Sequence, residues 1–108
     1  MDTAKISGML KRGVCVVGEF RGRTLETVKY LDRNTKQATH FNQALYRIEL
    51  EEGGIPVTLG LNFADGKEGE LPAFVRGDRV CALLSELKVQ RGVYSGRIDG
   101  RTGGVVKV

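Results

Sequence analysis

Residues Phe74 to Asp99 read Phe-Val-Arg-Gly-Asp-Arg-Val-Cys-Ala-Leu-Leu-Ser-Glu-Leu-Lys-Val-Gln-Arg-Gly-Val-Tyr-Ser-Gly-Arg-Ile-Asp, and the rest of the chain is organised around this stretch. Gly77 and Asp78 are a turn signal that opens a long run of β-forming residues. Gly92 interrupts that run before a second β-like segment, residues 93–98. The stretch therefore predicts a buried strand that continues into a hairpin.

Apolar residues occupy both alternating sets of positions in the first half of this strand. One set is Cys81, Leu83, Leu87 and Val89; the other is Val80, Ala82 and Leu84, after which the pattern turns polar. Alternate residues of a strand point to opposite faces, so we expect the first half to be buried on both faces. A single barrel of this size is not expected to cover the second set alone. That set therefore predicts an interface in a homodimer or larger assembly.

Length and composition predict one globular domain over residues 1–108, with residues 1–12 as an N-terminal extension that forms either a short helix or an added strand. No apolar run approaches the roughly 18 residues of a membrane span, and the first residues lack the apolar segment of a signal peptide. A cytoplasmic protein without membrane association is expected. Cys15 and Cys81 lie in apolar β-like runs, which predicts buried free thiols in a reducing compartment.

Short β-like segments separated by turn signals continue along the whole chain. Besides the central stretch they are residues 13–20, 24–31, 45–50, 55–63 and 105–108, with a turn expected at 21–23, a hairpin turn at 32–36, weak patterning at 37–44 and a helical turn near 71–75. The 15 glycines against two prolines agree with many tight turns. About five main strands without a helical period predict an all-β fold, a five-stranded OB-type barrel with extended hairpins, because closure removes exposed strand edges.

The net charge of +4 favours an acidic partner, and the basic residues cluster on the two predicted hairpins. Cations neutralise phosphates and release counterions, whereas aromatic rings stack on bases of any sequence. The candidate nucleic-acid-binding residues are Arg21, Arg23, Lys29, Tyr30, Arg33, Lys36, Phe41, Lys88, Arg91, Tyr94 and Arg97. Tyr94 is the leading stacking candidate, because glycines at positions 92 and 96 leave its ring little local cover.

Ordinary structural roles compete with these assignments. The cations also fit a solvated hairpin rim, and the aromatics also fit a core, as we expect for Tyr46, Phe20, Phe63 and Phe74. A single histidine, His40, has no suitable nucleophile or carboxylate beside it in the sequence pattern, so no enzyme, metal or cofactor is predicted. Paired carboxylates for hydrolysis or for a magnesium ion are a competing interpretation of five acidic residues. These fall in a hairpin tip and an acidic loop, places that fit solubility better: Glu49, Glu51, Glu52, Asp65 and Glu68.

Four short motifs of the second half add a resemblance. They are Tyr-Arg-Ile-Glu-Leu at 46–50, Gly-Ile-Pro-Val at 54–57, Leu-Ser-Glu-Leu-Lys-Val at 84–89 and Gly-Val-Tyr-Ser-Gly-Arg-Ile-Asp at 92–99. In order and spacing they resemble the single-stranded DNA-binding protein of filamentous phages. The resemblance implies an OB-type barrel, a two-fold dimer and cooperative, sequence-independent coating of single-stranded DNA during replication, in a host cytoplasm. It implies an aromatic contact at Tyr94, places Phe41 near another family aromatic, and has Ile55 where the family carries an aromatic.

The sequence therefore predicts a non-enzymatic protein that binds single-stranded DNA. An RNA-binding module remains a close alternative, because stacking and phosphate contacts do not exclude a 2′-hydroxyl. A different class also remains open, an OB-fold adaptor that uses the same barrel surface to bind a protein. A small hydrolase is a remote third reading.

Overall fold

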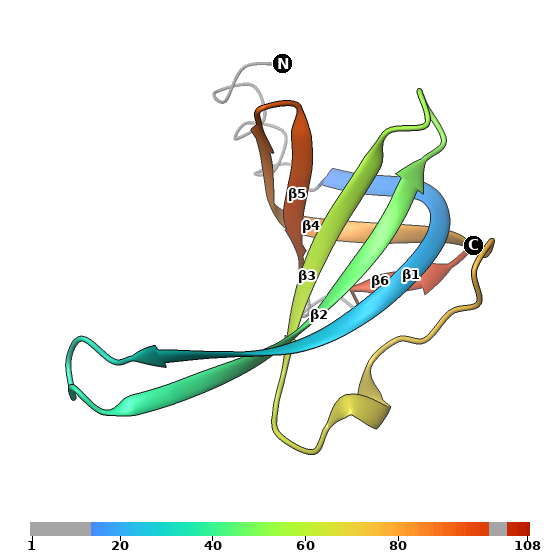
Figure 1. The fold of residues 1–108 in the computed structure, drawn as a ribbon. Coiled ribbons are helices and arrows are strands. Elements are labelled where there is room, and N and C mark those ends of the chain that lie inside the picture. Colours follow the sequence, from blue (N-terminus) through green and yellow to red (C-terminus); the bar gives the residue numbers. More distant parts are fainter. Residues whose placement is uncertain (1–13, 100–103) are drawn as a thin grey trace.

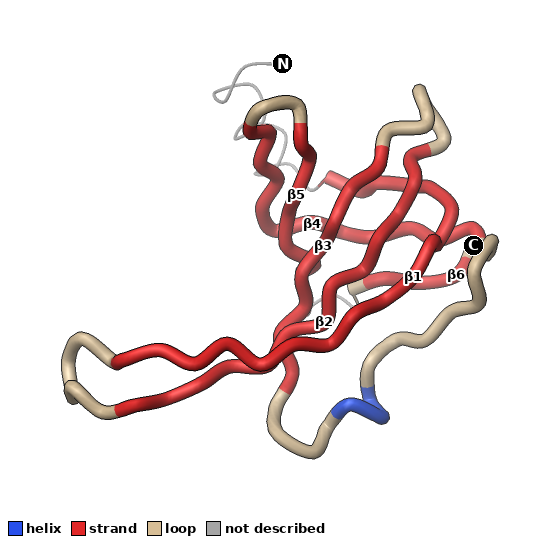
Figure 2. The backbone as a smooth tube through the Cα atoms, viewed as in Figure 1, coloured by secondary structure: helices blue, strands red, loops and turns tan. Residues whose placement is uncertain are grey.

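The computed structural model describes residues 14–99 and 104–108, and the expected N-terminal extension lies outside these ranges. Nearly all of the described chain is strand and turn (Figures 1 and 2). The elements are β1 (Val14–Leu31), β2 (Ala38–Leu50), β3 (Pro56–Phe63), the short 3-10 helix η1 (Glu68–Glu70), β4 (Arg79–Gln90), β5 (Val93–Ile98) and β6 (Val105–Lys107). The prediction of an all-β fold is confirmed. The helical turn precedes its expected place near residues 71–75.

The strands form one sheet in the order β1-β2-β3-β5-β4-β6, and β1 also pairs with β4. This additional pairing closes β1, β2, β3, β5 and β4 into a ring of five strands. The β3–β5 pair is parallel and the other pairs are antiparallel. The ring leaves β6 as a short strand on the outer side of β4.

Strand β1 bends, and this allows it to pair with two neighbouring strands. Its first part pairs with β4 as far as Glu19, and from Gly18 onward it pairs with β2. A Cβ on Gly18 would lie 2.3 Å from the carbonyl oxygen of Glu49, so only glycine permits this close crossing. The turn expected at residues 21–23 is instead a bulge between Phe20 and Gly22 within one continuous strand.

The core lies inside the ring and is built from one face of each strand. Its buried members are Phe20, Ala44, Tyr46, Ile48, Val57, Leu59, Val80, Ala82, Leu84, Ile98 and Val105, with Phe63, Phe74 and Tyr94 packed against them. The expectation that Val80, Ala82 and Leu84 remain uncovered in one chain is wrong, because their exposed fractions are 0%, 0% and 2%. Pairing of β4 with β1, β5 and β6 turns this set inward, so it supplies no argument for a dimer.

The β1–β2 hairpin extends well beyond the ring as a long arm (Figure 1). Strand β3 accompanies β2 only as far as the Asn42–Phe63 pair, and beyond it β1 is the one strand of residues 14–99 and 104–108 that pairs with β2. We call residues 28–41 the wing. Asp32 organises the wing's tip, since its Oδ1 accepts hydrogen bonds from the backbone N–H groups of Asn34 and Thr35 at 2.8 and 3.0 Å.

Candidate nucleic-acid interface

One continuous outer surface crosses β2, β3, β5 and the distal half of β4. The pairing register places Arg47 beside Thr58, and Thr58 beside Ser95, which in turn faces Lys88. We call this surface the outer face; it comprises Gln43, Leu45, Arg47, Thr58, Gly60, Asn62, Glu86, Lys88, Ser95 and Arg97. The intervening residues, among them Tyr46 and Leu59, are buried in the core, so the outer face is the side of the sheet directed to solvent.

Arg97 lies at the middle of the outer face. Its Nη2 donates a 2.6 Å hydrogen bond to Oδ1 of Asn62 on β3. A Cβ on Gly60 would lie 3.6 Å from Nη1 of Arg97 and 3.4 Å from Oε1 of Gln43, so these side chains extend over the bare backbone of Gly60. The guanidinium therefore lies across the sheet. It has five N–H donors in all, and those not used by Asn62 are left for a phosphate.

Two further cations share this surface. Nη1 of Arg47 donates a 2.6 Å hydrogen bond to Oγ1 of Thr24, and Nζ of Lys88 lies 3.2 Å from Oε1 of Glu86. Lys88 is 67% exposed, so the attraction between this pair is screened by water. Both cations remain accessible to an anionic ligand.

The wing carries an aromatic pair. The ring centroids of Tyr30 and Phe41 are 5.9 Å apart with an interplanar angle of 59°. Phe41 follows the same alternation along β2 as Gln43, Leu45 and Arg47, so the pair lies on the outer-face side of β2. Tyr30 is 47% exposed and offers a partly open ring surface.

Tyr94 points the other way. It pairs with Val57, a core residue, and its partly buried ring packs against the core. Ser95, the next residue of β5, and Lys88, which pairs with Ser95 from β4, lie on the opposite face. The structure therefore separates Tyr94 from Lys88 and Arg97, which the sequence had grouped into one site.

The remaining predicted cations occupy four places, of which the acidic region around Arg21 is described below. Lys29, Arg33 and Lys36 are exposed on the wing, and Arg91 is exposed at the β4–β5 turn, where its φ of 51° fits a tight left-handed turn residue. Arg23 is instead tied to the carbonyl oxygen of Pro72 at 3.1 Å.

That carbonyl also accepts a 2.6 Å hydrogen bond from the hydroxyl of Tyr46, whose pKa is raised chiefly by burial. Arg23 therefore supports the contact between Tyr46 and Pro72 and does not point freely toward a ligand.

An acidic region lies at the β2–β3 end of the ring. Arg21 is held there by Glu19 and Glu49, at 3.2 and 3.7 Å. Arg79 makes a close ion pair with Glu51, and its hydrogen bond lowers the pKa of that carboxyl. Arg21 and Arg79 are thus neutralised locally, away from the wing.

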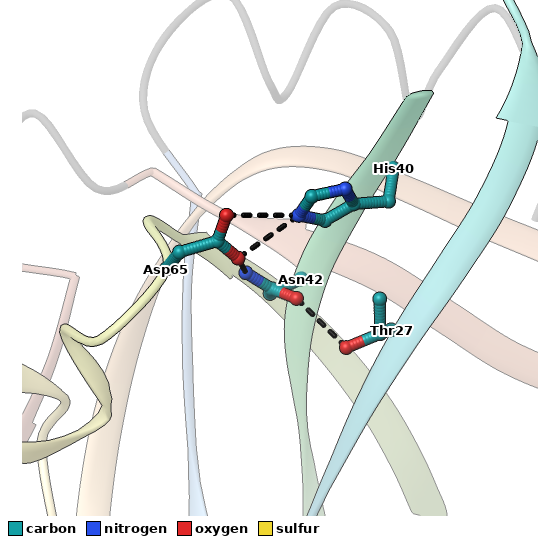
Figure 3. A network of polar contacts seen from close by, with 4 residues as sticks. All are labelled: Thr27, His40, Asn42 and Asp65. Carbon is teal, nitrogen blue, oxygen red and sulfur yellow. Dashed lines mark hydrogen bonds and ion pairs between the residues drawn. The ribbon is translucent and has the colours of Figure 1, made fainter. Parts of the chain in front are cut away.

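A polar network joins the base of the wing to the loop after β3 (Figure 3). Nε2 of His40 lies 2.9 and 3.0 Å from the two carboxylate oxygens of Asp65. Nδ2 of Asn42 donates to Oδ1 of Asp65 at 2.6 Å, and Oγ1 of Thr27 donates to Oδ1 of Asn42 at 2.8 Å. The pKa of Asp65 is lowered first by the Asn42 hydrogen bond and then by His40.

The cysteines differ from expectation. Cys15 is exposed and Cys81 is half-buried, because both lie on the outward side of the β1–β4 pair, opposite the core. Burial is the first cause that raises the pKa of Cys81, and the neighbouring Cys15 is the second.

Within residues 14–99 and 104–108, no cluster of three or more His, Cys, Asp or Glu side chains is arranged to hold a metal ion. No helix in the same part of the chain has the length and apolar character needed to cross a membrane. A turn is also expected from the sequence at residues 99–104, of which residues 100–103 lie outside the described ranges.

Comparison with known proteins adds no relative: the chain matches no protein-family model, no curated protein and no solved structure. The resemblance to the filamentous-phage proteins accordingly stays an expectation from the sequence.

Sequence reasoning missed part of the outer face. Arg47, Gln43 and Asn62 were not among the predicted site residues, although they lie beside Arg97 and the wing. The alternation of Tyr46, Ile48 and Leu50 inward was a usable signal, since it leaves position 47 outward. Asn62 had no such signal, because its importance arises from the parallel β3–β5 junction.

Proposed function

We propose that this protein is a non-enzymatic binder of single-stranded DNA with little dependence on sequence. The observation that carries the proposal is the alignment of Arg47, Arg97 and the Tyr30–Phe41 pair along one side of the sheet. Grooves for single strands combine cations that follow the backbone with rings that stack on bases. The outer face and the wing together supply both.

The strand order supports an OB-type barrel as the finer description of the ring. In that fold, the face of strands 2 and 3 and the loops between strands 1–2 and 4–5 bind oligonucleotides. Here the corresponding parts are the outer face, the wing tip with Arg33 and Lys36, and the β4–β5 turn with Arg91. Arg33, Lys36, Arg47, Arg91 and Arg97 lie on these parts and make no ion pair with a carboxylate of the described residues, whereas Arg21 and Arg79 at the acidic β2–β3 end are paired with glutamates.

An adaptor that binds another protein is the second candidate. Leu25 and Leu31 are 42% and 64% exposed on the side of the β1–β2 hairpin opposite to Tyr30. Exposed apolar residues on a projecting hairpin suit a protein contact. A homodimer, expected from the sequence, is one form of such a contact, and light scattering at tens of micromolar distinguishes a pair from a single chain.

A fluorescence titration tests the leading proposal. Labelled dT, rU and duplex DNA oligonucleotides of equal length are titrated with the protein at two salt concentrations. We expect binding to dT that exceeds binding to the duplex and weakens with salt. Equal or tighter binding to rU would favour an RNA module, and no binding to any of the three at low salt would overturn the proposal and favour the adaptor.

A further inference from the structure

The point at which the wing leaves the ring is held by the four-residue network of Figure 3. β3 stops pairing with β2 at Phe63, opposite Asn42. Continued in the same register, Asp65 would lie opposite His40, and the two side chains do meet there at 2.9 Å. Asp65 therefore continues the link between β3 and β2 by side chains after the backbone ladder has ended.

The individual contacts differ in strength. Asp65 is 71% exposed and His40 is 44% exposed, so water screens their attraction. Asn42, in contrast, is only 8% exposed and is the buried polar residue of the described core. Its hydrogen bonds to the Asp65 carboxylate and from Thr27 are short and partly shielded, so they supply most of the restraint.

In the part of the chain that the structure describes, no third strand accompanies the wing. Residues 28–31 and 38–41 form backbone pairs only with each other, so the direction of the wing depends on what is fixed at its base. A two-stranded ribbon alone is weakly stabilised in water. The network is the set of side-chain contacts that joins this base, through Thr27 and Asn42, to the loop at Asp65.

We propose that Asp65 is a positioning residue for nucleic-acid binding: through Asn42 and His40 it fixes the direction of the wing, and so aligns the Tyr30–Phe41 pair with the outer face. The inference rests on the proposed function. In this role Asp65 acts through its neighbours and not by contact with the nucleic acid, which as an anion it would repel. Its contribution to affinity comes from pre-organisation, because a wing that is already aligned loses less freedom on binding.

Because a carboxylate repels DNA, repulsion and positioning predict opposite changes in affinity when Asp65 is removed. Asp65→Ala and Glu70→Ala each remove one carboxylate from the loop between β3 and β4, and Glu70 pairs only with Lys67, at 3.7 Å, among the contacts of that loop. Electrostatics alone would strengthen DNA binding in both variants. Positioning predicts the opposite for Asp65→Ala, an affinity for dT oligonucleotide about fivefold lower, comparable to the loss of one hydrogen bond. Glu70→Ala should bind as tightly as the parent protein or more tightly.

The direction of the wing is measured separately, without any nucleic acid. In the parent protein, amide residual dipolar couplings from residues 28–31 and 38–41 should fit the same alignment tensor as those of the ring. In Asp65→Ala the wing couplings should shrink or require a second tensor, while the ring couplings stay unchanged. Asp65→Asn keeps the shape of the side chain and provides a second variant if the alanine variant is poorly folded. Its amide oxygen can still accept the hydrogen bond from Asn42 but is uncharged, so a smaller change in the same direction is expected.

The two proposals fail differently. Wing couplings in Asp65→Ala that still fit the parent tensor would overturn the positioning role, whatever the protein binds. An affinity for dT that rises equally in Asp65→Ala and Glu70→Ala would overturn it as well. A parent protein that binds no oligonucleotide would overturn the proposed function, and the couplings would then report only on the wing itself.

Discussion

Arg97 and Asn62 join β5 to β3 by a 2.6 Å hydrogen bond across the parallel junction of the ring. The same contact holds the guanidinium over Gly60, in the middle of the outer face. A cation fixed in this way loses little side-chain freedom when it contacts a phosphate. The β3–β5 junction therefore also fixes the position of Arg97, the central cation of the candidate interface.

Removal of this cation should change the salt dependence of binding. Arg97→Ala is expected to weaken dT binding for every sequence alike and to reduce the slope of log K against log salt by about 0.7, the value for one phosphate contact on a single strand. The matched control is Arg79→Ala, which also removes one positive charge but from the ion pair with Glu51. Its slope should equal that of the parent protein. An equal reduction in both variants would show that only net charge matters.

Substitution of Tyr30 tests whether the aromatic pair of the wing stacks on bases. Tyr30→Ala is expected to cost about 1–3 kcal/mol of binding free energy, with little dependence on the base, because one stacked ring is lost. The control is Leu31→Ala, which removes a 64% exposed apolar side chain from the opposite side of the wing. Fluorescence anisotropy measures the affinity of both variants for dT and for dA oligonucleotides. If Tyr30→Ala binds each oligonucleotide as tightly as Leu31→Ala does, Tyr30 has no stacking role.

Tyr94 should behave as a structural residue. Because its ring packs against the core beside Val57, Tyr94→Ala is expected to lower the free energy of unfolding by about 2 kcal/mol, less than for a fully buried aromatic ring. Tyr94→Phe keeps the packing and should leave stability close to that of the parent. Chemical denaturation measures both. A Tyr94→Ala variant with unchanged stability and strongly impaired binding would restore the role that the sequence suggested.

Acid should destabilise the protein in a defined direction. The pKa values of Asp32, Glu51 and Asp65 are all lowered in the folded chain, chiefly by hydrogen bonds from backbone, Arg79 and Asn42 respectively. Groups with a lowered folded pKa contribute stability above their unfolded value, and this contribution disappears as pH falls through the folded value. The thermal midpoint should therefore decline as pH falls below the ordinary values of 3.8 for aspartate and 4.5 for glutamate.

A variant identifies one source of that decline. Asp32→Ala removes the carboxylate that accepts two backbone hydrogen bonds at the wing tip. It should lower the thermal midpoint at neutral pH and show a smaller decline in acid than the parent. A decline as steep as in the parent protein would assign the acid sensitivity to other carboxylates.

Much of the fold follows from local patterns, and the errors have physical causes. The alternation in residues 55–63 and the turn residues at 32–36 correctly indicate β3 and the first hairpin, since both depend on neighbouring residues alone. The inward direction of Val80, Ala82 and Leu84 could not be read, because both faces of β4 begin apolar and a bulge between Leu84 and Glu86 changes the alternation. Only the pairing with distant β1 decides which face is buried.

The candidate site was predictable in its composition more than in its arrangement. The cations and aromatics of the wing follow from the sequence, and Tyr30 and Phe41 are indeed neighbours. The grouping of Tyr94 with Lys88 was wrong in geometry, because residues 94 and 95 point to opposite faces and Ser95 is the partner of Lys88. The Asn42–Asp65 contact joins residues separated by a whole strand, and no local pattern marks it.

Backbone amide shifts during titration with a dT oligonucleotide locate the binding surface residue by residue. Perturbations should concentrate on Tyr30, Phe41, Arg47, Asn62 and Arg97, with the wing and outer face changing together. The outward side of the β1–β4 pair, at Cys15, Val17 and Leu83, should remain unperturbed. Perturbations confined to that side, or an unchanged spectrum at saturating oligonucleotide and low salt, would contradict the assignment of the outer face as a binding surface for single-stranded DNA.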